Sequence, residues 1–369
     1  MLGNTDETPA QQPLADFGSA DFDNTEFEPS AAAYKDEPLL TESKHRFVMF
    51  PIHYNEIWQA YKAAEAKFWS AEEIALSEDA EGWETLSGKE KSVLLQILLL
   101  LATNDSFVGN VQSRVANEIQ AAEPRAYYGF QIMQKNIHLE LLNALLGLFL
   151  KDDASRDLIY ETISSFPSLH RKIAWVERHI HKSHEHFSVR NVALAIYSKI
   201  FNSTLSIIAV HLAAKVPKYE RSALPGFLHG LIKMHHDYHH YYELSTILGD
   251  LLVNKVPVSK VHAMLQEAVD IEEELVKDLF SYAGNAIALA GTTVDPAELK
   301  RYCKFVADQT VVGLGFEKVF GVTDPLPWAT RIIESETIKI KSKTPVTAIQ
   351  KKAEVPANIE SAFTLDDDF

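Results

Sequence analysis

The sequence predicts an all-α fold built as a bundle of long helices. From about Tyr54 to Glu334, apolar residues recur at intervals of three and four, which is the spacing of one helix face. Proline and glycine separate the periodic blocks, and no run of alternating polar and apolar residues indicates a sheet. Several blocks are about twenty residues long, which is typical of a helical bundle.

Seven helical blocks are predicted, each from its own apolar period and from the breakers on either side. The blocks are Ile57–Phe68, Lys91–Ile119, Ile132–Leu150, Val189–Ala214, Phe227–Leu252, Val261–Ile287 and Pro296–Phe320. The breakers that separate them are Gly88, Pro124, Pro167, Pro217 with Pro225, Pro257 and Gly291. The central 43–334 region is therefore expected to fold as one helical domain.

The two ends of the sequence differ in composition from this domain. Residues 1–40 hold nine acidic residues against a single basic one, Lys35, and show no sustained apolar period. Such a composition cannot bury enough apolar surface to fold, so residues 1–42 are expected to be disordered. After Pro327 the sequence becomes polar and rich in lysine, which predicts a flexible linker and tail over residues 335–369.

The overall charge and the cysteine content restrict the classes of partner and compartment. The formal net charge is −16, which argues against binding to nucleic acid or to anionic membranes. The only cysteine is Cys303, so no intrachain disulfide can form, which fits a reducing compartment. The longest apolar run, Ile97–Ala102, is far shorter than the ~18 residues of a membrane span. The N-terminus lacks the apolar region of a secretory signal, so a soluble protein of the cytoplasm or nucleus is expected.

One stretch resembles a known metal-binding helix. Residues 128–132 read Tyr-Gly-Phe-Gln-Ile and are followed by Lys135-Asn136-Ile137-His138. This stretch resembles the central helix of the small, radical-generating subunit of class I ribonucleotide reductase, where a Glu-Asn-Ile-His metal motif follows the same frame. The radical tyrosine of that family comes four residues after the histidine, a position held here by Leu142. The resemblance extends from about Lys44 to Phe369 and implies a ferritin-like helical bundle.

The resemblance also assigns a position in this sequence to each metal ligand of the family. Ferritin-like di-iron bundles use a carboxylate from each of two helices and a Glu-x-x-His pair from each of two others. The assigned positions are Ala75, Lys135, His138, Ser198, His236 and His239. Four carboxylates are thus expected to be lost and two histidines kept, so no metal cofactor is expected. We hypothesise that Lys135 supplies positive charge in place of a metal, since unpaired buried carboxylates are costly.

The radical-transfer path implied by the resemblance is also expected to be interrupted. Trp58 matches the tryptophan of that path, and His235 occupies the position of its aspartate. No tyrosine follows Tyr302, so the tail lacks the tyrosine that continues the path in the family. For Trp58 alone, core packing is the favoured interpretation, because a tryptophan on a helix needs no redox role.

The histidines allow a second interpretation. His235, His236, His239 and His240 lie within six residues, and histidines four residues apart have spacing compatible with zinc or copper. A re-purposed site of His138, His236 and His239 would make the protein a histidine-based metalloprotein. Against this alternative, Lys135 would repel a divalent ion.

The C-terminus indicates a partner. Its apolar anchors and acidic residues match the tail through which the family's small subunits dock on the large subunit; they are Phe363, Leu365, Asp366, Asp367, Asp368 and Phe369. The resemblance therefore implies a non-catalytic small subunit that supports deoxyribonucleotide synthesis. It would pair with an active small subunit, or with itself, and bind the large subunit by its tail. An inhibitory decoy for the large subunit is the remaining alternative.

Overall fold

The computed structural model describes residues 36–44, 46–181, 185–214, 222–283, 288–289, 292–293 and 295–335. Within these ranges the protein is almost entirely helical, and its strands are one antiparallel pair of two residues each. The predicted all-α class is therefore confirmed.

The α-helices are α1 (Asn55–Glu65), α2 (Asp79–Glu84), α3 (Gly88–Glu118), α4 (Ala122–Phe149), α5 (Asp153–Ser164), α6 (Pro167–Ile180), α7 (Phe187–Ile200), α8 (Ser203–Ala214), α9 (Pro225–Leu251), α10 (Val258–Ala283), α11 (Pro296–Gly313) and α12 (Pro327–Ile333). The short elements are the 3-10 helices η1 (Pro38–Leu40) and η2 (Ala71–Glu73) and the strands β1 (Ala288–Leu289) and β2 (Thr292–Thr293).

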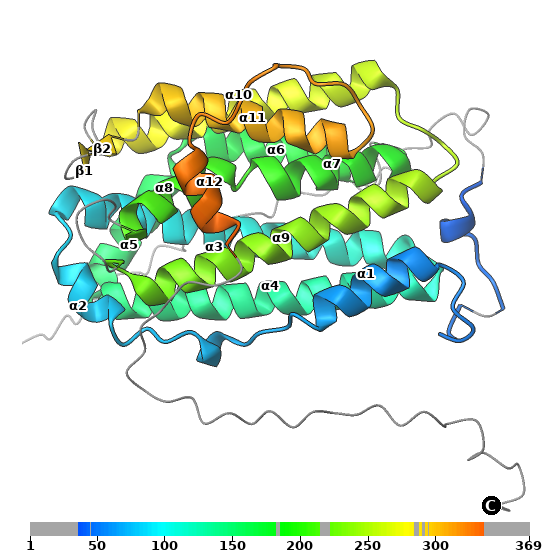
Figure 1. Ribbon diagram of the computed structural model, residues 1–369, viewed down its shortest axis with the longest axis horizontal. Helices are drawn as coiled ribbons and strands as arrows, with labels where there is room; N and C mark the ends of the chain where they lie inside the picture. The colour runs from blue at the N-terminus through cyan, green and yellow to red at the C-terminus, as the bar shows by residue number, and fades with distance from the viewer. Residues whose placement is uncertain are drawn as a thin grey trace, which may run out of the picture. The chain divides into compact units, whose positions relative to one another are not determined.

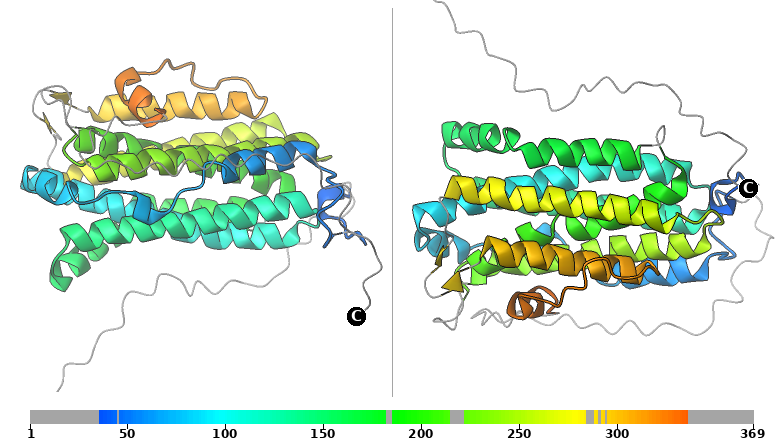
Figure 2. Two further views of the ribbon diagram at one scale, coloured as in Figure 1. Left: turned by 60° about the horizontal axis from the view of Figure 1, so that its bottom comes forward. Right: turned by 90° about the horizontal axis from the view of Figure 1, so that it is seen from above.

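The long helices of the described part run side by side (Figure 1). Helix α3 packs along α4, α7 packs along α9, and α10 packs against both α6 and α11. Helix α1 lies against α4 and α9, and α12 crosses α8 and α9. Figure 2 shows the same arrangement from two further directions. Helices α3, α4, α7 and α9 thus enclose a common interior, in which side chains from several helices can meet.

Capping contacts and a proline explain where two of the long helices begin. Ser87 and Glu90 form a reciprocal capping box at the start of α3, in which each side chain accepts a hydrogen bond from the other's backbone amide. The start of α9 is capped from outside the helix, because the Asp79 carboxylate accepts hydrogen bonds from the amides of Gly226 and Phe227 at 2.8 and 2.7 Å. Proline occupies the first position of α9, where its missing amide costs nothing.

The predicted block Val189–Ala214 is broken into two helices. Helix α7 ends before Phe201 and Asn202, and α8 begins at Ser203. A buried carboxylate from α10 stabilises this break, because Glu272 accepts hydrogen bonds from both the amide and the hydroxyl of Thr204. Every residue of α8 is buried, so this helix lies wholly inside the domain.

Several predicted boundaries differ from the structure. Helices α5 and α6 fill the stretch between two predicted blocks, and Pro124 lies in the first turn of α4, where proline is tolerated, instead of preceding the helix. Helix α11 ends at Gly313, short of Phe320, and Gly315 follows with a φ of +83°. Residues 284–287, the end of the sixth predicted block, lie outside the described residues.

The segment predicted to be disordered reaches into the fold at its end. Residues 1–35 lie outside the described residues, but Leu39 is buried at 1% exposure. The Glu37 carboxylate accepts hydrogen bonds from the amides of Val253 and Asn254, at 2.8 and 2.9 Å, and so binds the backbone just after the end of α9. The structure therefore corrects the predicted boundary for residues 36–42, because a composition-based boundary does not detect a single buried leucine and a carboxylate that binds backbone amides. The predicted linker and tail from residue 336 onward lie outside the described residues.

Two helical stretches, 88–118 and 187–214, are long and apolar enough to cross a membrane by length and composition alone. Within the structure their most apolar windows are 72% and 94% buried, as expected for core helices of a bundle.

Candidate functional site: a buried charge cluster

Four charged side chains meet in the interior of the bundle. Asp105 comes from α3, Lys135 and His138 come from successive turns of α4, and Asp237 comes from α9. None of the four is more than 3% exposed. Isolated charges are too costly to bury in this way, so their mutual contacts must stabilise them.

His138 links the two carboxylates. Its Nδ1 lies 2.8 Å from Asp105 Oδ2, and its Nε2 lies 2.9 Å from Asp237 Oδ2. A neutral imidazole can donate a hydrogen bond from one nitrogen only, whereas an imidazolium donates from both. Burial opposes the charged ring, but the hydrogen bonds to the two carboxylates outweigh it and raise the pKa of His138. The geometry therefore favours a doubly protonated His138.

Lys135 provides the second positive charge of the cluster. Its Nζ lies 3.5 Å from Asp105 Oδ1 and 4.3 Å from the centre of the Tyr241 ring. Burial lowers the pKa of Lys135, and the nearby Asp105 partly offsets this effect. Burial alone would raise the pKa of Asp105, but Lys135, His138 and the Tyr238 hydroxyl together lower it. Two carboxylates thus face two cationic groups, and their formal charges cancel.

Asp237 also joins the cluster to a tryptophan. Trp69 Nε1 donates a hydrogen bond of 2.9 Å to Asp237 Oδ2, and the Trp69 ring stacks on His138 at a centroid distance of 5.8 Å. Gln134 Nε2 donates to the other oxygen of Asp237. The result is a continuous hydrogen-bonded path from Trp69 through Asp237 and His138 to Asp105.

This hydrogen-bonded path runs through other residues than Trp58 and His235, the positions that the resemblance assigned to the interrupted radical-transfer path. Trp58 packs against Phe50 and Tyr61, at centroid distances of 6.0 and 5.4 Å, and has no hydrogen bond to a carboxylate among the described residues. His235 lines a separate pocket. The aspartate position of the path on α9 was therefore assigned two residues too early, to His235 instead of Asp237. The single aspartate in the middle of that helix, Asp237, was the signal that could have given the correct assignment.

The same shift changes which residues of α9 face α4. Tyr238 and Tyr241, one turn apart, place their rings 5.7 and 4.3 Å from Lys135 Nζ. The Tyr238 hydroxyl donates a hydrogen bond of 2.9 Å to Asp105. A Lys-x-x-His pair on α4 thus faces a Tyr-x-x-Tyr pair on α9, at the i, i+3 spacing that di-iron bundles use for Glu-x-x-His.

Ala75 is not part of the cluster. It is exposed, and its carbonyl lies beside Gly226 in the first turn of α9. Asp237 comes eleven positions after Gly226, which places the two residues ~16 Å apart along the helix axis. The carboxylate that α3 contributes to the cluster is Asp105, a residue outside the six positions assigned from the sequence. Sequence reasoning missed Asp105, although it is the only charged residue of α3 between Lys91 and Arg114.

The remaining predicted positions are not part of the cluster. Leu142 is fully buried on α4, one turn beyond His138. Ser198 is buried on α7, where its hydroxyl donates to the carbonyl of Leu194 at 2.8 Å. The tail residues from Phe363 to Phe369 lie outside the described residues.

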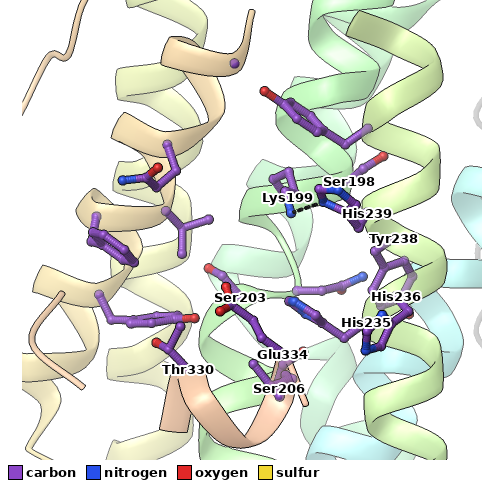
Figure 3. Close-up of a pocket in the computed structure, with 18 of the residues that line it drawn as sticks. Ser198, Lys199, Ser203, Ser206, His235, His236, Tyr238, His239, Thr330 and Glu334 are labelled. Atoms are coloured by element: carbon purple, nitrogen blue, oxygen red, sulfur yellow. Dashed lines mark hydrogen bonds between the residues drawn. The ribbon is translucent and has the colours of Figure 1, made fainter. Parts of the chain in front are cut away.

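His236 and His239 also lie apart from the cluster. Together with His235 and Ser198 they line a cavity of about 670 Å³ on another side of α9 (Figure 3). His236 is hydrogen-bonded to the carbonyl of Ser335, and His239 Nδ1 lies 3.3 Å from Lys199 Nζ. The structure therefore does not bring His138, His236 and His239 together as a ligand set.

The donor set of the cluster does not fit a pair of iron ions. Both nitrogens of His138 are engaged by carboxylates, and the Lys135 ammonium occupies the space beside Asp105. Burial raises the pKa of Tyr238 and of Tyr241 well above the ordinary value, so both remain neutral phenols, which are poor ligands. Among the described residues, no group of three or more His, Cys, Asp or Glu side chains is arranged to hold a metal.

The comparisons with known proteins agree with this architecture. The family model for the ribonucleotide reductase small chain matches residues 46–327. Ribonucleoside-diphosphate reductase subunit M2 of Homo sapiens is 34% identical over 92% of this chain and 84% of its own length. Subunit M2 of Danio rerio is 33% identical over 94% of this chain and 87% of its own length.

Solved structures show the same fold. The structure of the ribonucleotide reductase Rnr4 homodimer from Saccharomyces cerevisiae matches with a TM-score of 0.70 and 30% identity, over 80% of this chain and 90% of that one. The R2 subunit of Clostridium botulinum matches with a TM-score of 0.64 over 77% of this chain and 89% of its own, at 18% identity.

Proposed function

The chain belongs to the ribonucleotide reductase small-chain family, and on this basis we propose that it acts as a small subunit that carries neither a di-iron centre nor a tyrosyl radical. The observation that carries the proposal is the buried cluster, in which Lys135 and His138 provide the two positive charges opposite Asp105 and Asp237. The role of the subunit would then be structural: to pair with an active small subunit and support deoxyribonucleotide synthesis by that partner.

Charge balance gives the physical reason for this proposal. Buried carboxylates need compensating positive charge, which metal ions supply in di-iron bundles. Here side chains of the protein itself carry the compensating charge, so no bound metal ion is needed for it. The bundle can therefore keep the family's fold without a metal, and Leu142 leaves no phenol at the position of the radical tyrosine.

The hydrogen-bonded path from Trp69 to Asp105 fits the same proposal. It joins the loop after α1 to α9, α4 and α3, and every member is buried. With no oxidising centre at its inner end, its role would be to fix the relative positions of these segments.

The partners follow from family membership and the tail sequence. We propose that the protein dimerises with an active small subunit or with a second copy of itself, and that the tail ending at Phe369 binds the large subunit. Apolar anchors separated by acids suit docking into a groove with basic surroundings. A linker of about thirty residues has a typical reach of ~30 Å, which is sufficient for docking from a tether. The cytoplasm is the proposed compartment.

The test combines metal analysis with reconstitution. Untagged protein is exposed to Fe(II) and oxygen, and its metal content and EPR spectrum are recorded, followed by titration into a reductase assay containing a large subunit and limiting active small subunit. The proposal predicts no stoichiometric iron, no radical signal, and turnover that is sustained or raised. A fall in turnover that requires the tail would instead identify an inhibitory decoy.

A further inference from the structure

The cavity beside the charge cluster has the size of a small-molecule site. It is bounded by α7, α8, α9, α11 and α12 and has a volume of about 670 Å³ (Figure 3), within the usual range of ligand pockets. Its lining is divided between two kinds of wall. The basic wall holds Lys199, His235, His236 and His239, and the facing wall from α11 and α12 is largely apolar and includes Tyr302, Phe305, Val306, Val312 and Ile333.

The basic wall lacks a matching anion. Lys199 Nζ contacts His239 Nδ1 at 3.3 Å and the Tyr242 ring at 5.3 Å, and it forms no ion pair within 4.0 Å in the described part of the protein. Glu334 is the one carboxylate among the lining residues. Burial lowers the pKa of Lys199 to about 8, and the charge of Glu334 offsets this effect only in part.

The His235 ring is a second polar group of this cavity that could interact with a ligand. The ring is partly buried, lines the cavity and contacts the His236 ring at a centroid distance of 6.4 Å, and it has no side-chain hydrogen bond to a described residue. Burial, with Lys199 and the neighbouring histidines, lowers the pKa of His235 well below its ordinary value, and lowers the pKa of His239 to about 4. A polar ring that lines a cavity and has no hydrogen-bond partner in the protein can form a hydrogen bond with a ligand.

We infer that this pocket binds a small aromatic anion, with its carboxylate or phosphate between Lys199 and His235 and its ring against Phe305 and Ile333. The charged end of such a ligand would supply the missing counter-charge, and the hydroxyls of Ser203, Ser206 and Thr330 add hydrogen-bonding groups to the lining. The apolar wall would cover the ring. This inference stands on the cavity alone and does not depend on the proposed role in ribonucleotide reduction.

The ligand's charge also sets the expected pH dependence. The titratable groups that face the site are Lys199, His235, His236, His239, Tyr238, Tyr242, Tyr302 and Glu334, with Glu243 and His240 close to His239. An anion favours the protonated forms of the lysine and histidines. Affinity should therefore rise as the pH falls from 8 to 6.5, with proton uptake on binding.

The experiment is calorimetric titration of the full-length protein with phenyl phosphate, benzoate, inorganic phosphate and, as a neutral isostere of benzoate, benzamide. We expect one of the two aromatic anions to bind and benzamide to bind far more weakly. The aromatic anion with the higher affinity identifies the charged group that the site prefers. Lys199→Gln should weaken binding on the order of tenfold, and Glu334→Gln should strengthen it severalfold by removing the internal negative charge. Lys62→Gln on the exposed surface of α1 is the matched control and should change nothing.

Three results would overturn the inference. They are the absence of binding for both aromatic anions at millimolar concentration, equal binding of benzamide and benzoate, and an unchanged affinity in a folded Lys199→Gln variant. If Lys199→Gln does not fold, His235→Gln replaces it, and unchanged affinity there has the same meaning. Binding of inorganic phosphate without either aromatic anion would also contradict the proposed ligand class.

Discussion

Replacing Lys135 with methionine removes one cation from the buried cluster while keeping a similar side-chain length. Asp105 is 1% exposed, and it would keep hydrogen bonds only from His138 and Tyr238. Removing one partner of a buried ion pair typically destabilises a protein by about 3–5 kcal/mol, because the other charge stays buried without compensation. We expect a loss of this size in the free energy of unfolding, measured by urea denaturation followed by circular dichroism.

Two controls make this prediction specific. The double variant Lys135→Met/Asp105→Asn removes both charges, so it should recover much of the stability lost in the single variant. Arg171→Met removes a cation from an exposed pair, Arg171 with Glu274 at 2.9 Å, and should cost only about 0–1 kcal/mol. A loss below about 1 kcal/mol for Lys135→Met, or no recovery in the double variant, would refute the view that Lys135 compensates the Asp105 charge.

Three further predictions concern the same fold. The pKa of His138 is raised in the folded protein, so the stabilising contribution of this histidine is complete below the unfolded pKa near 6.5 and is lost as the pH rises through the folded pKa. The variant His138→Gln should therefore flatten the decline of stability on the alkaline side. The measurement is urea denaturation at a series of pH values. Trp69→Phe removes the hydrogen bond to the Asp237 carboxylate and should cost about 1.5–3 kcal/mol of unfolding free energy, and a value near zero would mean that this bond contributes nothing. Gly82→Ala should lower the thermal midpoint, because a Cβ there would lie 1.6 Å from the carbonyl oxygen of Ala223, whereas Gly147→Ala on the open face of α4 should raise it slightly; equal shifts would contradict the described packing.

The helical class and most long helices could be predicted from the sequence because they follow from local periodicity. The apolar period and the breakers around Lys91–Ile119 and Phe227–Leu252 locate α3 and α9 to within a few residues. The break between α7 and α8 could not be predicted in this way, because it depends on Glu272, which reaches Thr204 from a helix about seventy residues later. A tertiary contact of this kind leaves no local pattern.

The charge cluster could be predicted only in part. Lys135 and His138 can be placed because they share one helix and one short motif that resembles the family's metal-binding helix. Asp105, Trp69 and Asp237 come from three other segments, and the structure alone shows that they converge on His138. A lone aspartate in the apolar middle of α3 is nevertheless a signal, since a buried charge requires a partner.

The histidines of α9 show what helical spacing alone cannot predict. Their i, i+4 spacing predicts a shared helix face, and the structure does place His235 and His239 on one cavity. Spacing on one helix could not show that Lys199 approaches from α7 and takes the place beside His239 that a metal would need. The neighbour from another helix, and not the spacing, determines the chemistry of this wall.

The most direct test of the proposed function is the metal content of the untagged protein after exposure to Fe(II) and oxygen, read by mass spectrometry and EPR. We expect no stoichiometric metal and no radical signal, because Lys135 and His138 already compensate Asp105 and Asp237. Stoichiometric metal that is lost in Asp105→Ala would contradict it and would show that the buried cluster opens to bind a metal ion.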